Sequence, residues 1–84
     1  MWVFMKSTNS NMNRYIGKKC ELITPRRKTD GVRVLYACEP GNRLNWYFYT
    51  STITSITRDA DYDAGIEKMN IFTHNSVYTF YRNL

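Results

Sequence analysis

Polar and apolar residues alternate with a period of two along most of the chain beyond residue 17, in short runs rich in β-branched and aromatic side chains. Turn-forming residues such as Pro25, Gly31 and Pro40 separate these runs at short intervals. The pattern is typical of antiparallel β-structure, and almost no helix is expected. It predicts strands over residues 18–24, 32–39, 45–57, 66–73 and 76–82.

The alternation also predicts which side chains face the core. The first strand is expected to place Cys20, Leu22 and Thr24 on one face, and the second to point Val32, Val34, Tyr36 and Cys38 inward. Cys20 and Cys38 are then neighbours on facing strands with side chains on the same side. Two free, reduced thiols and a cross-strand disulfide both remain open on this pattern.

The third predicted strand cannot be straight. Residues 45–50 give the strongest strand signal in the chain, and the signal continues to residue 57. Ile53 and Ile56 are three positions apart, however, which strict alternation does not allow. A bulge or corner between Thr50 and Ile56 reconciles them, and such a corner lets one bent strand belong to both halves of a barrel.

A chain of 84 residues builds one core, so we expect a single domain. The predicted fold is all-β, a small SH3-like antiparallel barrel of five to six short strands formed by residues 16–84. A five-stranded oligonucleotide-binding barrel fits less well, because the chain is short and shows no helix. Residues 1–15 show no period and are interpreted as a flexible arm; whether Trp2, Val3 and Phe4 add a strand or pack on a neighbour is left open.

Charge is concentrated in the first part of the chain. Residues 14–33 carry seven basic residues against two acidic ones, whereas residues 34–84 carry four basic and five acidic residues. A positive field confined to one segment is expected where one face meets an anionic partner. No apolar run is long enough to span a membrane or to direct export, so a cytoplasmic protein without a membrane partner is expected.

Catalytic and metal-binding patterns are weak. His74, the single histidine, falls at a predicted hairpin tip, and both cysteines are expected inside, so a non-enzymatic protein without a cofactor is predicted. Asp59, Asp61 and Asp63 have the spacing with which a calcium loop begins. Gly65 comes one position late and Asn70 stands where the closing glutamate belongs, which favours a solvated acidic loop over residues 58–65 and no metal.

The best candidate site combines cations with aromatic rings. Basic side chains attract phosphates through counterion release, and exposed rings beside them stack on unpaired bases. Because residues 46–49 are four consecutive aromatic residues on a strand, two of the rings must face away from the core. The predicted nucleic-acid-binding residues are Lys18, Lys19, Arg26, Arg27, Lys28, Arg33, Trp46, Tyr47 and Tyr49.

Short motifs also suggest a family. Gly17 followed by two lysines, Thr24 with Pro25, residues 49–51 with Ile53, and residues 73–78 together resemble small accessory proteins of tailed bacteriophages, over residues 16–82. The resemblance carries no catalytic residues. It implies a viral accessory role in the host cytoplasm, in which the protein binds and redirects a host polymerase, nuclease or defence component.

The sequence therefore favours a small accessory protein whose basic face contacts nucleic acid or a nucleic-acid-bound host complex. Exposed aromatic residues equally suit a protein interface, so an inhibitor of a host or defence factor is the main alternative, using these rings or the segment from Trp2 to Phe4. A third hypothesis is a homo-oligomer that sequesters nucleotides between arginines of neighbouring subunits.

Overall fold

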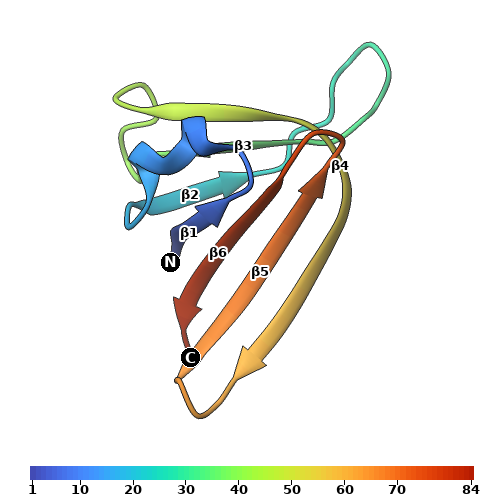
Figure 1. Cartoon of the computed structure of the whole chain (residues 1–84). Coiled ribbons are helices and arrows are strands. Elements are labelled where there is room, and N and C mark those ends of the chain that lie inside the picture. The colour runs from blue at the N-terminus through green and yellow to red at the C-terminus, as the bar shows by residue number, and fades with distance from the viewer.

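The computed structural model describes all residues, 1–84, and forms a closed barrel of six antiparallel strands (Figure 1). Each strand pairs with its neighbour in the chain, and the last strand pairs with the first. The predicted single-domain, all-β antiparallel barrel is confirmed. The elements are β1 (Trp2–Ser7), the 3-10 helix η1 (Ser10–Tyr15), β2 (Lys19–Ile23), β3 (Val34–Cys38), β4 (Tyr47–Asp61), β5 (Ile66–Thr73) and β6 (Val77–Asn83).

The first residues differ from the expected flexible arm. Strand β1 pairs with β2 and with β6, so it is the strand that closes the barrel. Phe4 is fully buried, and its ring contacts Phe48 and Phe80 at centroid distances of 5.8 and 5.3 Å. The polar run that follows forms η1, which brings Tyr15 onto the core. Only one fully buried residue marks β1, which is why its pattern reads as unstructured.

Strand β3 has the opposite orientation to the one predicted. Leu35 and Ala37 are fully buried in the core cluster, while Tyr36 points to the outer face and packs on other tyrosines. The error has a simple cause, since every residue from Val34 to Cys38 is apolar or aromatic and the alternation has no polar position to fix its phase.

The two cysteines do not face each other. Cys20 is part of the core cluster, whereas Cys38 is paired in register with Glu21 and therefore shares the outer face with that residue. Both thiols are buried and free. Burial raises the pKa of the Cys20 thiol to about 11, so this group stays protonated at neutral pH.

Strand β4 bends where the sequence predicts a corner. Its first part pairs with β3 as far as Thr52, and its second part pairs with β5 from Ile53 onward. The register shifts within both pairings, opposite the Val34 to Tyr36 step and between Ile53 and Ser55. One long strand thus belongs to the barrel and also to a projecting hairpin (Figure 1).

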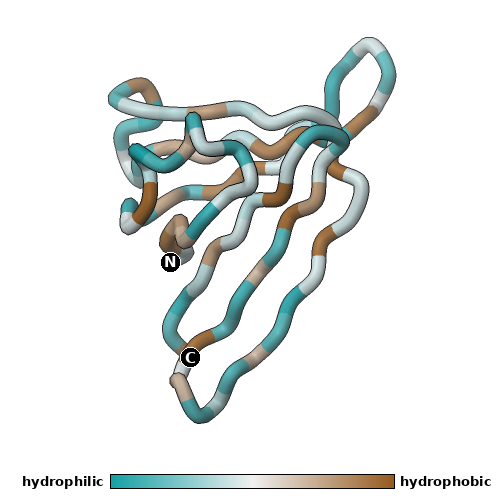
Figure 2. The backbone as a smooth tube through the Cα atoms, in the orientation of Figure 1, coloured by the Kyte–Doolittle hydropathy of each residue, from teal (hydrophilic) through white to brown (hydrophobic).

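We call this projection the extension and define it as residues 58–68, together with the end of β6 at residues 82–83. Figure 2 shows that its far end, around the turn between β4 and β5, is mostly hydrophilic. The acidic loop predicted over residues 58–65 is shorter than expected, because Arg58 to Asp61 continue β4 and only residues 62–65 form the turn. The acidic residues in this segment favour a solvated loop on the sequence alone. In the structure Asp59 belongs to β4 and lies opposite Lys68 of β5.

The remaining strand predictions agree with the structure. The terminal hairpin forms between β5 and β6, with His74 and Asn75 exposed in its turn.

No group of three His, Cys, Asp or Glu side chains comes close enough to hold a metal ion, and Asp61 instead accepts a hydrogen bond from the backbone N–H of Ala64 at 3.1 Å. None of the helical structure has the length and apolar character that crossing a membrane would require.

Candidate nucleic-acid interface

Three tyrosines form a cluster on the outer face of β3 and β4. The Tyr36 ring lies 5.5 Å from that of Tyr47 and 4.7 Å from that of Tyr49, and the latter two are 5.9 Å apart. Tyr47 and Tyr49 are 45% and 62% exposed, whereas Phe48 between them is buried in the core. The prediction that two of the rings at residues 46–49 face outward is therefore confirmed. We call these three residues the tyrosine cluster.

The register of the sheet explains why these rings meet. Tyr36 is paired directly with Tyr49 across β3 and β4, and Tyr47 is paired with Cys38 two positions along. Directly opposed side chains of an antiparallel sheet lie on the same face, within contact distance. The cluster is thus a property of strand pairing, and Tyr36 was missed from the sequence because β3 was expected to point it inward.

One side of the tyrosine cluster is fixed by polar contacts. The Tyr36 hydroxyl donates a hydrogen bond to the Arg43 carbonyl at 3.2 Å, and the Arg43 guanidinium donates to Glu21 at 2.8 Å. Desolvation raises the pKa of the Tyr36 phenol, and the hydrogen bond to Glu21 raises the pKa of Arg43. The phenol therefore remains a neutral hydrogen-bond donor, and the arginine is charge-compensated by Glu21.

A hollow of about 470 Å³ lies at one end of the tyrosine cluster. We call it the Trp46 hollow, and it is lined by Arg14, Tyr15, Lys18, Asn45, Trp46 and Tyr47. The Lys18 ammonium lies 5.7 Å from the Trp46 ring, and the Arg14 guanidinium lies 5.0 Å from the Tyr15 ring. The two rings are themselves 5.4 Å apart. Cations over aromatic faces at these distances interact favourably, and both Arg14 and Lys18 are exposed.

Lys19 belongs to the same end of the molecule, since it lines an adjoining hollow with Lys18 and Trp46. Arg14 and Tyr15 were not among the predicted site residues, because they were assigned to the arm. The signal that could have found them is their position a few residues before Lys18 and Lys19, which adds a third cation and an aromatic ring beside the first basic pair.

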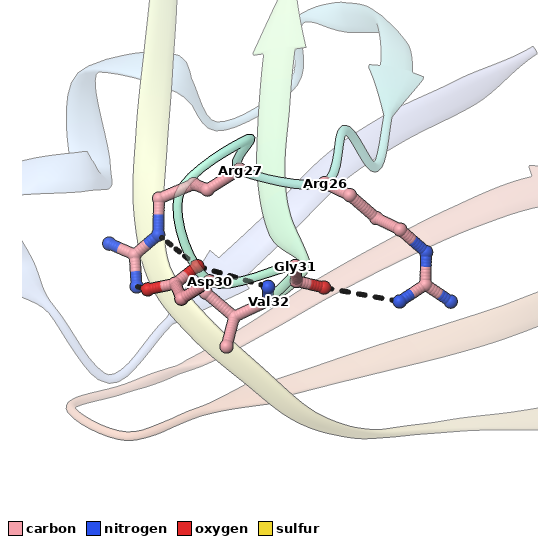
Figure 3. Close-up of polar contacts among 5 residues, drawn as sticks. All are labelled: Arg26, Arg27, Asp30, Gly31 and Val32. Atoms are coloured by element: carbon pink, nitrogen blue, oxygen red, sulfur yellow. Dashed lines mark hydrogen bonds and ion pairs between the residues drawn. The ribbon is translucent and has the colours of Figure 1, made fainter.

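The other predicted cations lie in the long connection between β2 and β3, which we call the basic loop (residues 24–33). Figure 3 shows that Arg27 folds back onto Asp30, with guanidinium-to-carboxylate distances of 2.8 and 3.3 Å. Arg26 donates instead to the Gly31 carbonyl at 3.1 Å, and Gly31 has a φ of 70° that closes the turn. The loop therefore has a defined shape although it is exposed.

Charge compensation in the basic loop is partial. The backbone N–H of Val32 and then the Arg27 guanidinium lower the pKa of Asp30, which keeps this carboxylate ionised. Arg27 is the only cation of the loop with an ion-pair partner. Arg26, Lys28 and Arg33 leave the loop with a net positive charge.

The structure separates the predicted cations into two groups. Lys18 and Lys19 stand at the start of β2, while the basic loop follows its end and projects from the opposite side of the barrel (Figure 1). The tyrosine cluster lies between them, since Tyr47 borders the Trp46 hollow and Tyr49 lines a second hollow with Pro25. The single basic patch expected from sequence is thus two groups of cations with exposed rings between them.

The second hollow, of about 410 Å³, was not foreseen from the sequence. Its lining residues are Ile23, Pro25, Tyr36, Arg43, Leu44 and Tyr49. Leu44 is 85% exposed at the edge of this hollow. Arg43 and Leu44 sit in the turn after β3, and only the outward orientation of Tyr36 makes them part of this face.

The outer face of β2, β3 and β4 therefore combines exposed aromatic surface with two groups of cations, and it also carries Glu21, which is paired with Arg43. Comparison with protein-family models, with curated proteins and with solved structures found no match to this chain.

Proposed function

We propose that this protein is a non-enzymatic module that binds single-stranded nucleic acid on the outer face of β2, β3 and β4. The observation that carries the proposal is the exposure of Tyr47 and Tyr49 between two groups of cations. Unpaired bases would stack on these rings, and the phosphates would lie near Lys18 at one end and near the basic loop at the other. Stacking and phosphate contacts together give affinity without sequence preference.

The spacing favours a short single strand over a mononucleotide or a duplex. Strand β2 has five residues and so covers about 16 Å between the two groups of cations. One nucleotide cannot reach both groups, and paired bases cannot stack on protein rings. A single strand that runs along β2 can contact both groups of cations and the tyrosine cluster at once.

The resemblance to phage accessory proteins suggests where the protein would bind single-stranded nucleic acid. In that proposal, the protein acts in the host cytoplasm on single strands held in a polymerase, nuclease or defence complex. Contacts with the nucleic acid would direct it to the complex.

A direct test is fluorescence anisotropy with a short labelled oligothymidylate. We expect Tyr47→Ala and Tyr49→Ala each to weaken binding about 5- to 150-fold, the range that follows from about 1–3 kcal/mol per stacked base. The matched control is Tyr62→Ala, because Tyr62 is 83% exposed in the turn between β4 and β5, away from the face. Equal losses for Tyr62 and Tyr49 would contradict the proposal.

Salt dependence tests the role of the cations. Binding should weaken steeply between about 50 and 200 mM salt. In Lys18→Ala, the fall of the logarithm of the association constant with the logarithm of salt concentration should be less steep by about 0.7, because one phosphate contact is lost. Lys6→Ala is the control, since Lys6 is an exposed cation on β1 that lines neither the Trp46 hollow nor the second hollow. Absence of binding at the lower salt concentration would reject this function.

One observation favours a second candidate, a protein partner. The second hollow joins the exposed Leu44 to Tyr49, Ile23 and Pro25, and contiguous exposed apolar surface of this kind marks protein interfaces. Pull-down from bacterial lysate with and without nuclease separates the two functions. A partner that survives nuclease and is lost with Leu44→Asp supports the protein interface, whereas loss of all partners on nuclease treatment supports nucleic acid.

A further inference from the structure

The second half of β4 has one edge without a partner. From Ile53 to Asp61 the strand pairs with β5 on one side. On its other side the pairing with β3 ends at Thr52, where the last backbone bond runs from the Ile53 N–H to the Arg33 carbonyl at 2.8 Å. Residues 54–61 make no backbone hydrogen bond on that side, and all of them are exposed. We call them the open edge.

We propose that the open edge is a dimer interface, at which a second copy of this chain adds its own open edge in antiparallel register. The β4, β5 and β6 strands of each copy would then form one continuous sheet of six strands. The unpaired N–H and C=O groups of residues 54–61 would gain partners, which is the reason that open edges recruit further strands.

Symmetry and charge together select one register. In an antiparallel pair related by a two-fold axis, one residue must lie opposite its own copy. Centring the pair on Arg58 opposes two arginines, and centring it on Asp59 opposes two aspartates. Like charges directly opposed are destabilising, so both registers are disfavoured.

The register centred on Ile56 is excluded by the length of strand that it can pair. A pair centred on Ile56 would bring Ile53 and Thr52 into the interface, but these residues are already bonded to β3 and to Arg33. That register could use only residues 54–58. Centring on Thr57 allows residues 54–60 to pair, which is almost the whole open edge, and brings no like charges face to face.

The Thr57 register also matches side chains across the interface. On the outer face, Thr57 would meet its own copy and Ser55 would lie opposite Asp59, where its hydroxyl can donate to the carboxylate. On the other face, which carries Met69 and Ile71 of β5, Ile56 would lie opposite Arg58. Ile56 is 42% exposed in the single chain, and pairing with the second strand would cover part of this surface.

The first experiment is analytical ultracentrifugation of the full chain over a range of concentrations. We expect a reversible equilibrium between the 10.0 kDa monomer and a dimer. Thr57→Lys opposes two ammonium groups at the axis and should raise the dissociation constant about tenfold or more. Thr29→Lys adds the same charge in the basic loop and should leave it unchanged. A monomer at every concentration, or a dimer indifferent to Thr57→Lys, would overturn the proposal.

A cross-linking experiment fixes the register. Thr57→Cys places two thiols opposite each other, at a separation that a disulfide can bridge, so a mild oxidant should link the two chains. Ala60→Cys would stand about 20 Å from its own copy and should not cross-link. The natural cysteines are buried and do not compete. Equal cross-linking of both variants would show that the chains do not pair in this register.

Discussion

The barrel and the extension share one strand but are stabilised in different ways. In the barrel, β1 to β6 enclose fully buried side chains such as Phe4, Leu35 and Phe80. In the extension, every residue from 58 to 65 is exposed, and no core is enclosed. Closure of the sheet therefore decides where apolar surface is buried, and a strand that leaves the barrel loses that source of stability.

Cross-strand contacts replace the core in the extension. Arg82 forms an ion pair with Glu67 at 2.8 Å, and the Trp2 ring lies 4.6 Å from the Arg82 guanidinium and 5.8 Å from the Arg58 guanidinium. Contacts of this kind on a protein surface contribute little individually. The comparison predicts that substitutions in the barrel are costly and that those in the extension are mild.

The largest effect is expected at Phe4. Phe4→Ala removes a fully buried ring from the centre of the barrel and should lower the free energy of unfolding by about 3–5 kcal/mol. Ile56→Ala is the matched truncation near the extension and should cost less than about 1 kcal/mol, because its side chain is 42% exposed. Urea denaturation followed by tryptophan fluorescence measures both. Similar losses at the two sites would remove the distinction between barrel and extension.

An intermediate effect is expected at Thr79, where the barrel meets the extension. This buried residue donates a hydrogen bond from its hydroxyl to the Asn70 side-chain oxygen at 2.8 Å. Thr79→Val keeps the shape and leaves the amide oxygen without this donor, so stability should fall by about 1–2 kcal/mol.

Thr54→Val serves as its control. The Thr54 hydroxyl donates to the Phe72 carbonyl at 3.2 Å, but the residue is exposed and water can replace the bond. We expect a loss below about 0.5 kcal/mol by the same denaturation experiment. A larger loss at Thr54 than at Thr79 would show that burial does not decide the cost here.

The smallest effect is expected in the basic loop, which belongs to neither region. The pKa of Asp30 is lowered in the folded protein, chiefly by the Val32 N–H. The contribution of this carboxylate to folding stability is therefore present above the ordinary aspartate pKa of about 3.9, and it is lost as the pH falls through the lowered value. In an NMR titration, the chemical shift of the Val32 amide should therefore change with pH at a midpoint below that ordinary value, because this amide donates to the Asp30 carboxylate. In Asp30→Asn this titration should be absent, while global stability stays the same.

Alternation with clear polar positions made parts of the fold predictable. The terminal hairpin was found in this way, and the corner in β4 followed from the spacing of Ile53 and Ile56. Where the pattern lacks polar positions, as in β3, the strand was found but its orientation was not. Whether the first residues form a strand stays open on the sequence, because the single fully buried residue of β1, Phe4, gives no period and the partners of the strand are distant in sequence.

The candidate site was predictable only where one strand determines exposure. Alternation within β4 required two of the four rings at residues 46–49 to face outward, and these two are Tyr47 and Tyr49. Arg14 and Tyr36 reach the face through η1 and β3, so their roles depend on tertiary packing that no local pattern contains. The separation of the basic residues into two groups likewise follows from the direction of β2.

The buried thiols give the protein an internal reporter of its own opening. At neutral pH a thiol with a pKa of about 11 is ionised in roughly one molecule in 10⁴, and Cys20 is in addition shielded from solvent. Alkylating reagents should therefore modify Cys20 only during excursions in which the barrel opens. The rate of modification would measure how often those excursions occur, without any label or substitution in the protein.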